Sequence, residues 1–136
     1  MARSDRFLDT NILLYVFNED DRRTALAREL IVAGGVFSMQ VANEFADVAR
    51  RKLNWSWNDV AAALESVQTY LGEPVALDHS THRAALDVSR RYGFRFYDSL
   101  IVASARLSGC RTLVTEDLQH GQVVDGVEIR NPFPPA

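Results

Sequence analysis

Short apolar runs alternate along the chain with longer segments in which apolar residues recur every three to four positions. The runs predict strands at residues 6–9, 36–37, 75–77, 112–115 and 127–130. The periodic segments predict helices from about residue 12, and over 22–32, 39–52, 56–71, 80–92 and 98–108. Strands that alternate with helices predict an α/β fold, an α/β/α sandwich with a mainly parallel central sheet.

Capping residues mark the ends of these predicted helices. Ser38 and Ser56 each precede a helical pattern and suit an N-cap, whereas Gly93 and Gly109 follow such patterns where a glycine commonly ends a helix. No internal repeat or linker-like composition interrupts the pattern. We therefore expect a single domain over residues 1–136.

Composition narrows the class of protein. Of the 136 residues, 47% are hydrophobic and 24% charged, as in an ordinary folded domain. The longest strictly apolar run, residues 12–17, is too short to cross a membrane, and no secretory signal opens the sequence. Cys110 is the single cysteine, which excludes an internal disulfide and a multi-cysteine zinc site. We expect a cytoplasmic protein without a membrane segment.

The charge is slightly acidic, with 15 basic and 18 acidic residues and a net charge of −3. This balance disfavours non-specific nucleic-acid binding through counterion release alone. Local basic groups remain candidates for RNA contacts, namely Arg50, Arg51 and Lys52 together, and Arg95. An equally good interpretation is that they form a solvated, charged surface.

Four acidic residues stand at predicted strand ends or on helices: Asp9, Glu44, Asp98 and Asp117. Each has a structural interpretation as well, because acids cap helix starts, favour the first helical turn or lie at the edge of an apolar helix face. If the four converge at one sheet edge, their repulsion requires raised pKa values or a bound cation. Ligation by oxygen alone favours Mg²⁺ or Mn²⁺, which promote phosphodiester hydrolysis.

Four sequence motifs occur in a fixed order along the chain. They are FLDTNILLY at 7–15, NEF at 43–45, YDSLIVASA at 97–105 and LVTED at 113–117. In this order and over this length, the sequence resembles PIN-domain ribonucleases, and more narrowly the VapC-type toxins of bacterial toxin–antitoxin systems. No single motif is specific, and the resemblance rests on all four together.

The resemblance implies a metal-dependent endoribonuclease. Asp9, Asp98 and Asp117 would hold Mg²⁺ or Mn²⁺, and Glu44 would complete the site directly or through water. The small polar residues Thr10, Asn11 and Thr115 would orient the carboxylates. Two adjacent acids, Glu116 and Asp117, are candidates for the fourth position, and the spacing from Thr115 favours Asp117.

The resemblance also implies partners: an RNA substrate, an antitoxin that covers the acidic groove, and a second copy of the chain in a homodimer. It does not identify the RNA. One alternative is a catalytically silent PIN-like domain that binds RNA or protein. Another is a phosphatase with an aspartate nucleophile, although such enzymes need a second aspartate where Asn11 stands.

Overall fold

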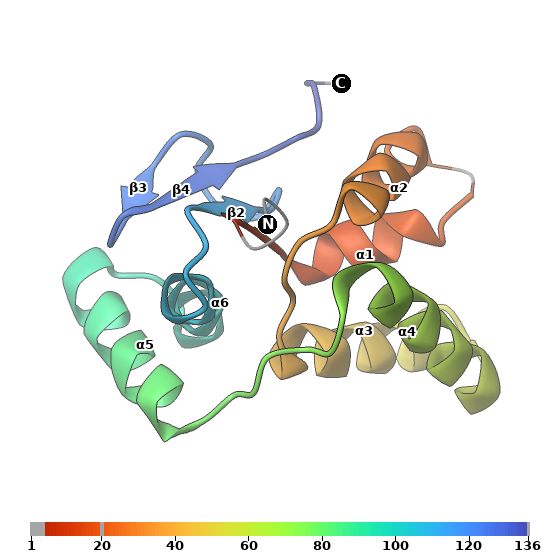
Figure 1. Ribbon diagram of the computed structural model, residues 1–136, viewed down its shortest axis with the longest axis horizontal. Coiled ribbons are helices and arrows are strands. Elements are labelled where there is room, and N and C mark those ends of the chain that lie inside the picture. The colour runs from red at the N-terminus through yellow and green to blue at the C-terminus, as the bar shows by residue number, and fades with distance from the viewer. Residues whose placement is uncertain (1–4, 20, 136) are drawn as a thin grey trace.

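The computed structural model describes residues 5–19 and 21–135. Its four-stranded sheet has the order β1-β2-β4-β3 (Figure 1). The strands β1 (Arg6–Leu8), β2 (Thr112–Val114) and β4 (Val127–Arg130) are parallel, and β3 (Val123–Val124) runs antiparallel to β4 at the edge. Apolar strand residues such as Phe7, Leu113 and Ile129 are in register and fully buried. The sheet is mainly parallel, as the alternating pattern predicts.

Six helices accompany the sheet in the described part of the chain. They are α1 (Thr10–Val16), α2 (Thr24–Ala33), α3 (Met39–Arg51), α4 (Trp57–Leu71), α5 (His79–Tyr92) and α6 (Phe96–Leu107). The helices α1 to α4 form one group, and α5 packs along α6 in another (Figure 1). The Arg6 guanidinium donates hydrogen bonds to the carbonyls of Leu30 (3.1 Å) and Gly34 (2.6 Å) at the end of α2, while α6 contacts β2 and β4. The predicted α/β/α sandwich is confirmed.

Two predicted strands, at 36–37 and 75–77, are wrong. Each reduces to a single parallel bridge, Val36 with Phe7 and Val75 with Ser38. The first segment has no room for more, because α2 ends beside Gly34 and Ser38 already caps α3. Conversely, β3 was not predicted, although Asp125-Gly126 is a hairpin signal whose two residues both have positive φ (51° and 82°).

Helix starts differ from the prediction by two residues at α1, α2 and α6, by one at α4 and α5, and not at all at α3. The helix α1 begins at Thr10 instead of residue 12, with Asp9 as its N-cap, and α6 begins at Phe96, so Asp98 lies inside its first turn. The helices α2 and α5 begin at Thr24 and His79 instead of residues 22 and 80. Within the described part of the chain, none of the helices has the length and apolar character needed to span a membrane.

Candidate active site

The four predicted acids line one pocket of about 390 Å³. Asp9 directly follows β1, Glu44 lies on α3, Asp98 stands in the first turn of α6, and Asp117 follows β2 in the loop. Parallel strands end at the same edge of a sheet, and the adjoining helices start there, so the topology brings together acids that are 108 residues apart. The structure thus places all four candidates in a common cavity.

Asp9 is the most buried of the four carboxylates. It is 6% exposed, and both of its oxygens accept a hydrogen bond: Oδ1 from the Thr10 backbone N–H (2.7 Å) and Oδ2 from the Thr115 hydroxyl (2.9 Å). The same Thr115 oxygen accepts from the Asn11 amide and from the Asp117 backbone N–H, at 3.1 Å each. One buried hydroxyl therefore fixes the end of β1 relative to the loop after β2.

Neighbouring polar side chains also hold Asp117 and Glu44. Asn11 Nδ2 donates to Asp117 Oδ2 at 3.1 Å, and the Thr10 hydroxyl donates to Glu44 Oε1 at 2.6 Å. These contacts place all three predicted orienting residues, Thr10, Asn11 and Thr115, in direct hydrogen bonds with the acidic group.

The electrostatics of the pocket penalise its negative charge. Burial raises the pKa of Asp9 from 3.8 to about 6 despite hydrogen bonds from Thr10 and Thr115 that lower it, and the charges of Asp117 and Glu44 add to the rise. Burial also raises the pKa of Asp98, with Asp117 and Glu44 acting in the same direction and Arg95 opposing them. The pocket therefore favours a positive partner.

Glu116, the other candidate for the fourth acid, turns away from the pocket. Its carboxylate accepts a hydrogen bond from the Tyr15 hydroxyl and pairs with Arg23 at 3.2 Å. Arg23 lies over the Tyr15 ring, 4.2 Å from its centroid, and also pairs with Asp21 at 2.8 Å. This network fixes the loop next to Asp117 and pairs the charge of Glu116 with that of Arg23.

The candidate RNA-contacting cations lie in two different places. Arg95 lines the acidic pocket. Near the end of α3, Arg50 donates a hydrogen bond to the Trp55 carbonyl and Arg51 forms an ion pair with Asp47 at 2.7 Å. Lys52 is the C-cap residue of α3 and is exposed. The structure does not bring these three residues to the pocket. Their role in RNA binding stays a prediction.

The pocket fits a hard divalent cation by the chemistry of its donors, which are carboxylate oxygens. Two further oxygens, Asn11 Oδ1 and Gln40 Oε1, are buried without a hydrogen-bond partner in the described part of the protein. Among residues 5–19 and 21–135, however, no three His, Cys, Asp or Glu side chains stand together as a ready set of metal ligands. The case for a cation thus rests on the shared pocket and its charge.

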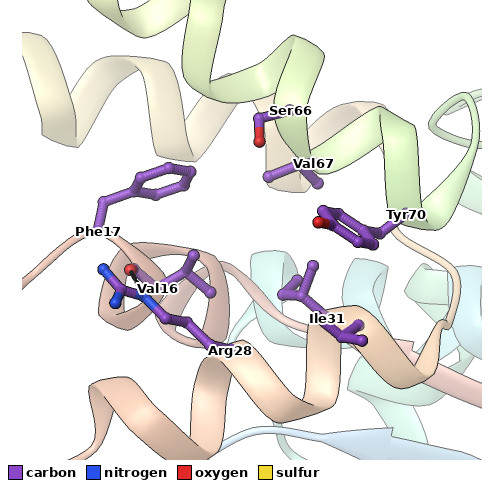
Figure 2. Close-up of a pocket in the computed structure, with 8 residues that line it drawn as sticks. Val16, Phe17, Arg28, Ile31, Ser66, Val67 and Tyr70 are labelled. Atoms are coloured by element: carbon purple, nitrogen blue, oxygen red, sulfur yellow. Dashed lines mark hydrogen bonds between the residues drawn. The ribbon is translucent and has the colours of Figure 1, made fainter.

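A second pocket has a different character (Figure 2). It lies between α1, α2 and α4 and is mostly apolar, with Phe17, Ile31, Val67 and Tyr70 among its walls. Arg28, the single charged group among its described lining residues, donates a hydrogen bond to the Val16 carbonyl at 3.0 Å. Since none of these described residues carries a carboxylate, they lack the groups for the predicted hydrolysis.

Other reactive side chains lie outside the acidic pocket. The rings of His79 and His82 stack on α5, with their centroids 6.4 Å apart. The His120 ring accepts a hydrogen bond from the Asn131 backbone N–H. Cys110 is buried, and burial raises the pKa of its thiol to about 11. One pocket residue that sequence reasoning missed is Gln40, because a polar residue near a helix start is ordinarily exposed.

Comparison with known proteins agrees with this geometry. The model of the PIN domain family matches residues 6–125. No curated protein sequence matches the chain significantly.

Solved structures share the fold at low sequence identity. A toxin–antitoxin complex from Klebsiella pneumoniae has a TM-score of 0.71 at 18% identity, with 94% of this chain and 98% of that chain covered. DNA-bound VapBC from Salmonella typhimurium has a TM-score of 0.69 at 20% identity (93% and 97% covered). VapC20 of Mycobacterium tuberculosis, described as a sarcin-ricin loop cleaving toxin, has a TM-score of 0.64 at 19% identity (79% and 86% covered). With a family match over most of its length, this chain belongs to the PIN domain family.

Proposed function

We propose that this protein is a metal-dependent endoribonuclease that hydrolyses RNA phosphodiesters, and that it is the toxin of a toxin–antitoxin pair. One observation carries the proposal: four carboxylates from four separate elements line a single pocket, and burial and mutual repulsion raise the pKa values of two of them. Membership of the PIN family and the likeness to VapC structures support it.

In this proposal Asp9, Asp98 and Asp117 hold Mg²⁺ or Mn²⁺, and Glu44 completes the site directly or through water. The cation, when bound, supplies the positive charge that activates water and stabilises the developing charge on phosphate oxygens. Thr115 keeps the Asp9 carboxylate fixed, and its hydroxyl also sets the position of Asp117.

Two further side chains have parts in this site. Thr10 holds the Glu44 carboxylate through its hydroxyl. Arg95 lines the pocket, and in this proposal its guanidinium contacts a phosphate of the substrate.

The test is cleavage of defined RNAs, including a sarcin-ricin loop oligonucleotide and tRNA, by the purified chain with Mg²⁺, Mn²⁺ or EDTA. We expect cleavage with the divalent ions, loss of cleavage with EDTA, and loss in Asp98→Asn. Asp59→Asn is a matched control, because Asp59 stands in the first turn of α4 as Asp98 does in α6, yet is exposed outside the pocket.

Four outcomes would contradict the proposal. Cleavage that survives EDTA, or full activity in Asp98→Asn, would exclude the metal mechanism. Absence of cleavage on all RNAs with either ion would favour the silent, binding-only domain. A trapped aspartyl-phosphate would favour the phosphatase, although Asn11 here donates to Thr115 and Asp117 instead of acting as an acid.

The partner that we propose is a small antitoxin encoded beside this gene. It would place a basic side chain among the carboxylates, because a cation there relieves the repulsion around Asp9. Co-expression should suppress both growth arrest and RNA cleavage, and light scattering would show whether the free toxin is the proposed homodimer. Sequencing of new RNA 5′ ends soon after induction would identify the substrate; no new ends would contradict a toxin role.

A further inference from the structure

Gln40 is a polar residue buried in the wall of the acidic pocket. It stands in the first turn of α3, one helical turn before Glu44, and is 5% exposed. Its Nε2 atom donates two hydrogen bonds, to Glu44 Oε2 at 3.2 Å and to the Tyr97 carbonyl at 3.1 Å. One amide thus joins the Glu44 carboxylate to the start of α6, at the residue that precedes Asp98.

Chemistry fixes the orientation of this amide. Both of its partners, a carboxylate and a backbone carbonyl, are acceptors only, so the nitrogen of Gln40 has to face them. Its oxygen, Oε1, is then left buried without a hydrogen-bond partner in the described residues. A buried unpaired acceptor costs stability, and an apolar side chain of the same size would avoid that cost. Packing alone therefore does not account for a glutamine here.

We propose that Gln40 is a positioning residue of the active site, which holds Glu44 in its working orientation and fixes α3 relative to the start of α6. The Glu44 carboxylate is then held at both oxygens, by the Thr10 hydroxyl at Oε1 and by Gln40 at Oε2. The proposal rests on the proposed nuclease function, because Glu44 matters for the reaction only if the pocket is the active site.

The first test compares Gln40→Met with wild type in RNA cleavage. Methionine keeps the length of the side chain and removes the amide. We expect kcat to fall by about 10- to 100-fold, the usual loss on removing a group that orients a site residue, with KM nearly unchanged. Gln68→Met, at an exposed position of α4, is the matched control and should leave kcat unchanged. A merely structural role predicts instead a lower Tm with unchanged kcat per folded molecule, and that result would overturn the proposal.

The second test asks whether Gln40 acts through Glu44. In a Glu44→Ala background the Gln40 amide keeps only its contact with the Tyr97 carbonyl, so Gln40→Met should cause a much smaller further loss of activity than it causes in wild type. A further loss of the same size as in wild type would overturn the proposal.

A third measurement needs neither RNA nor metal: NMR of the Gln40 side-chain amide, assigned by its absence in Gln40→Met. In Glu44→Ala its protons should shift and exchange with solvent about tenfold faster, since one of two acceptors is gone. Unchanged resonances would overturn the positioning of Glu44. If the contact is present but wild-type protein cuts no RNA, the proposed function has failed while the positioning contact stands.

Discussion

Asp9 is expected to lower the stability of the folded protein at neutral pH. Its pKa is raised from 3.8 to about 6, mainly by burial. A carboxyl group with a raised folded-state pKa favours folding below its unfolded pKa, and that contribution is lost as the pH rises through the folded pKa. With the two values above, ionisation of Asp9 costs about 3 kcal/mol of unfolding free energy at pH 7.5 but only about 1 kcal/mol at pH 4.5.

Asp9→Asn removes this ionisation while keeping the shape of the side chain. The amide oxygen still accepts from the Thr10 N–H, but the amide nitrogen cannot accept from the Thr115 hydroxyl, so that hydrogen bond is lost. We allow about 1 kcal/mol for its loss. The variant should then be more stable than wild type by about 2 kcal/mol at pH 7.5 and equal to it at pH 4.5.

Urea unfolding in EDTA-containing buffer at the two pH values measures this difference, with the EDTA excluding any effect of divalent ions. The exposed control Asp59→Asn should change stability by no more than about 0.5 kcal/mol at either pH. A variant less stable than wild type at pH 7.5, or one with the same advantage at both pH values, would refute the assignment of the burial penalty to Asp9. A stabilised but inactive variant would show that the pocket sacrifices stability for function.

Three further predictions concern the same pocket. Thr115→Val should lower the unfolding free energy by about 2–3 kcal/mol, because the lost hydroxyl makes hydrogen bonds with three partners. Thr115→Ser keeps the hydroxyl and should lower it by only about 1 kcal/mol through loss of the methyl group. Equal losses of the two variants in urea unfolding would contradict this. Asp117→Asn should reduce the rate of cleavage of labelled RNA by about 10- to 100-fold, and Glu116→Gln should reduce it much less. A larger loss in Glu116→Gln than in Asp117→Asn would make Glu116 the fourth acid. In thermal unfolding, Mn²⁺ at 100 times its Kd should stabilise wild type by about 2.7 kcal/mol and should stabilise Asp98→Asn less. If neither Mn²⁺ nor Mg²⁺ raises the Tm of wild type, the metal has no place in the mechanism.

The sequence predicts the fold well where periodicity or caps determine it. The helices and the parallel pairing follow from alternating patterns and from Ser38, Ser56 and Gly93 as caps. Strand length is less predictable. A segment such as 36–37 is apolar enough for a strand, but its extent depends on how many residues remain between α2 and α3, which only the packed helices decide.

The contacts inside the pocket are harder to derive from the sequence, because they join residues far apart in the chain. Nothing local indicates that the Thr115 hydroxyl meets Asp9, or that Gln40 reaches the carbonyl of Tyr97, 57 residues away. A glutamine one turn before a glutamate is ordinary on an exposed helix face. Burial of Gln40 becomes evident only when α6 is placed against α3 at the pocket.

Asp9 shows why a capping interpretation and a catalytic one need not compete. It has the extended backbone of an N-cap, with φ −80° and ψ 169°, and accepts the Thr10 N–H at the start of α1. A cap contact of this kind uses one carboxylate oxygen and directs the side chain to the strand end where Glu44, Asp98 and Asp117 also lie. The same bond that starts the helix therefore orients the acid toward the pocket. A substitution that spares the cap, such as Asp9→Asn, separates the two roles, since it keeps the acceptor for the Thr10 N–H and removes the charge.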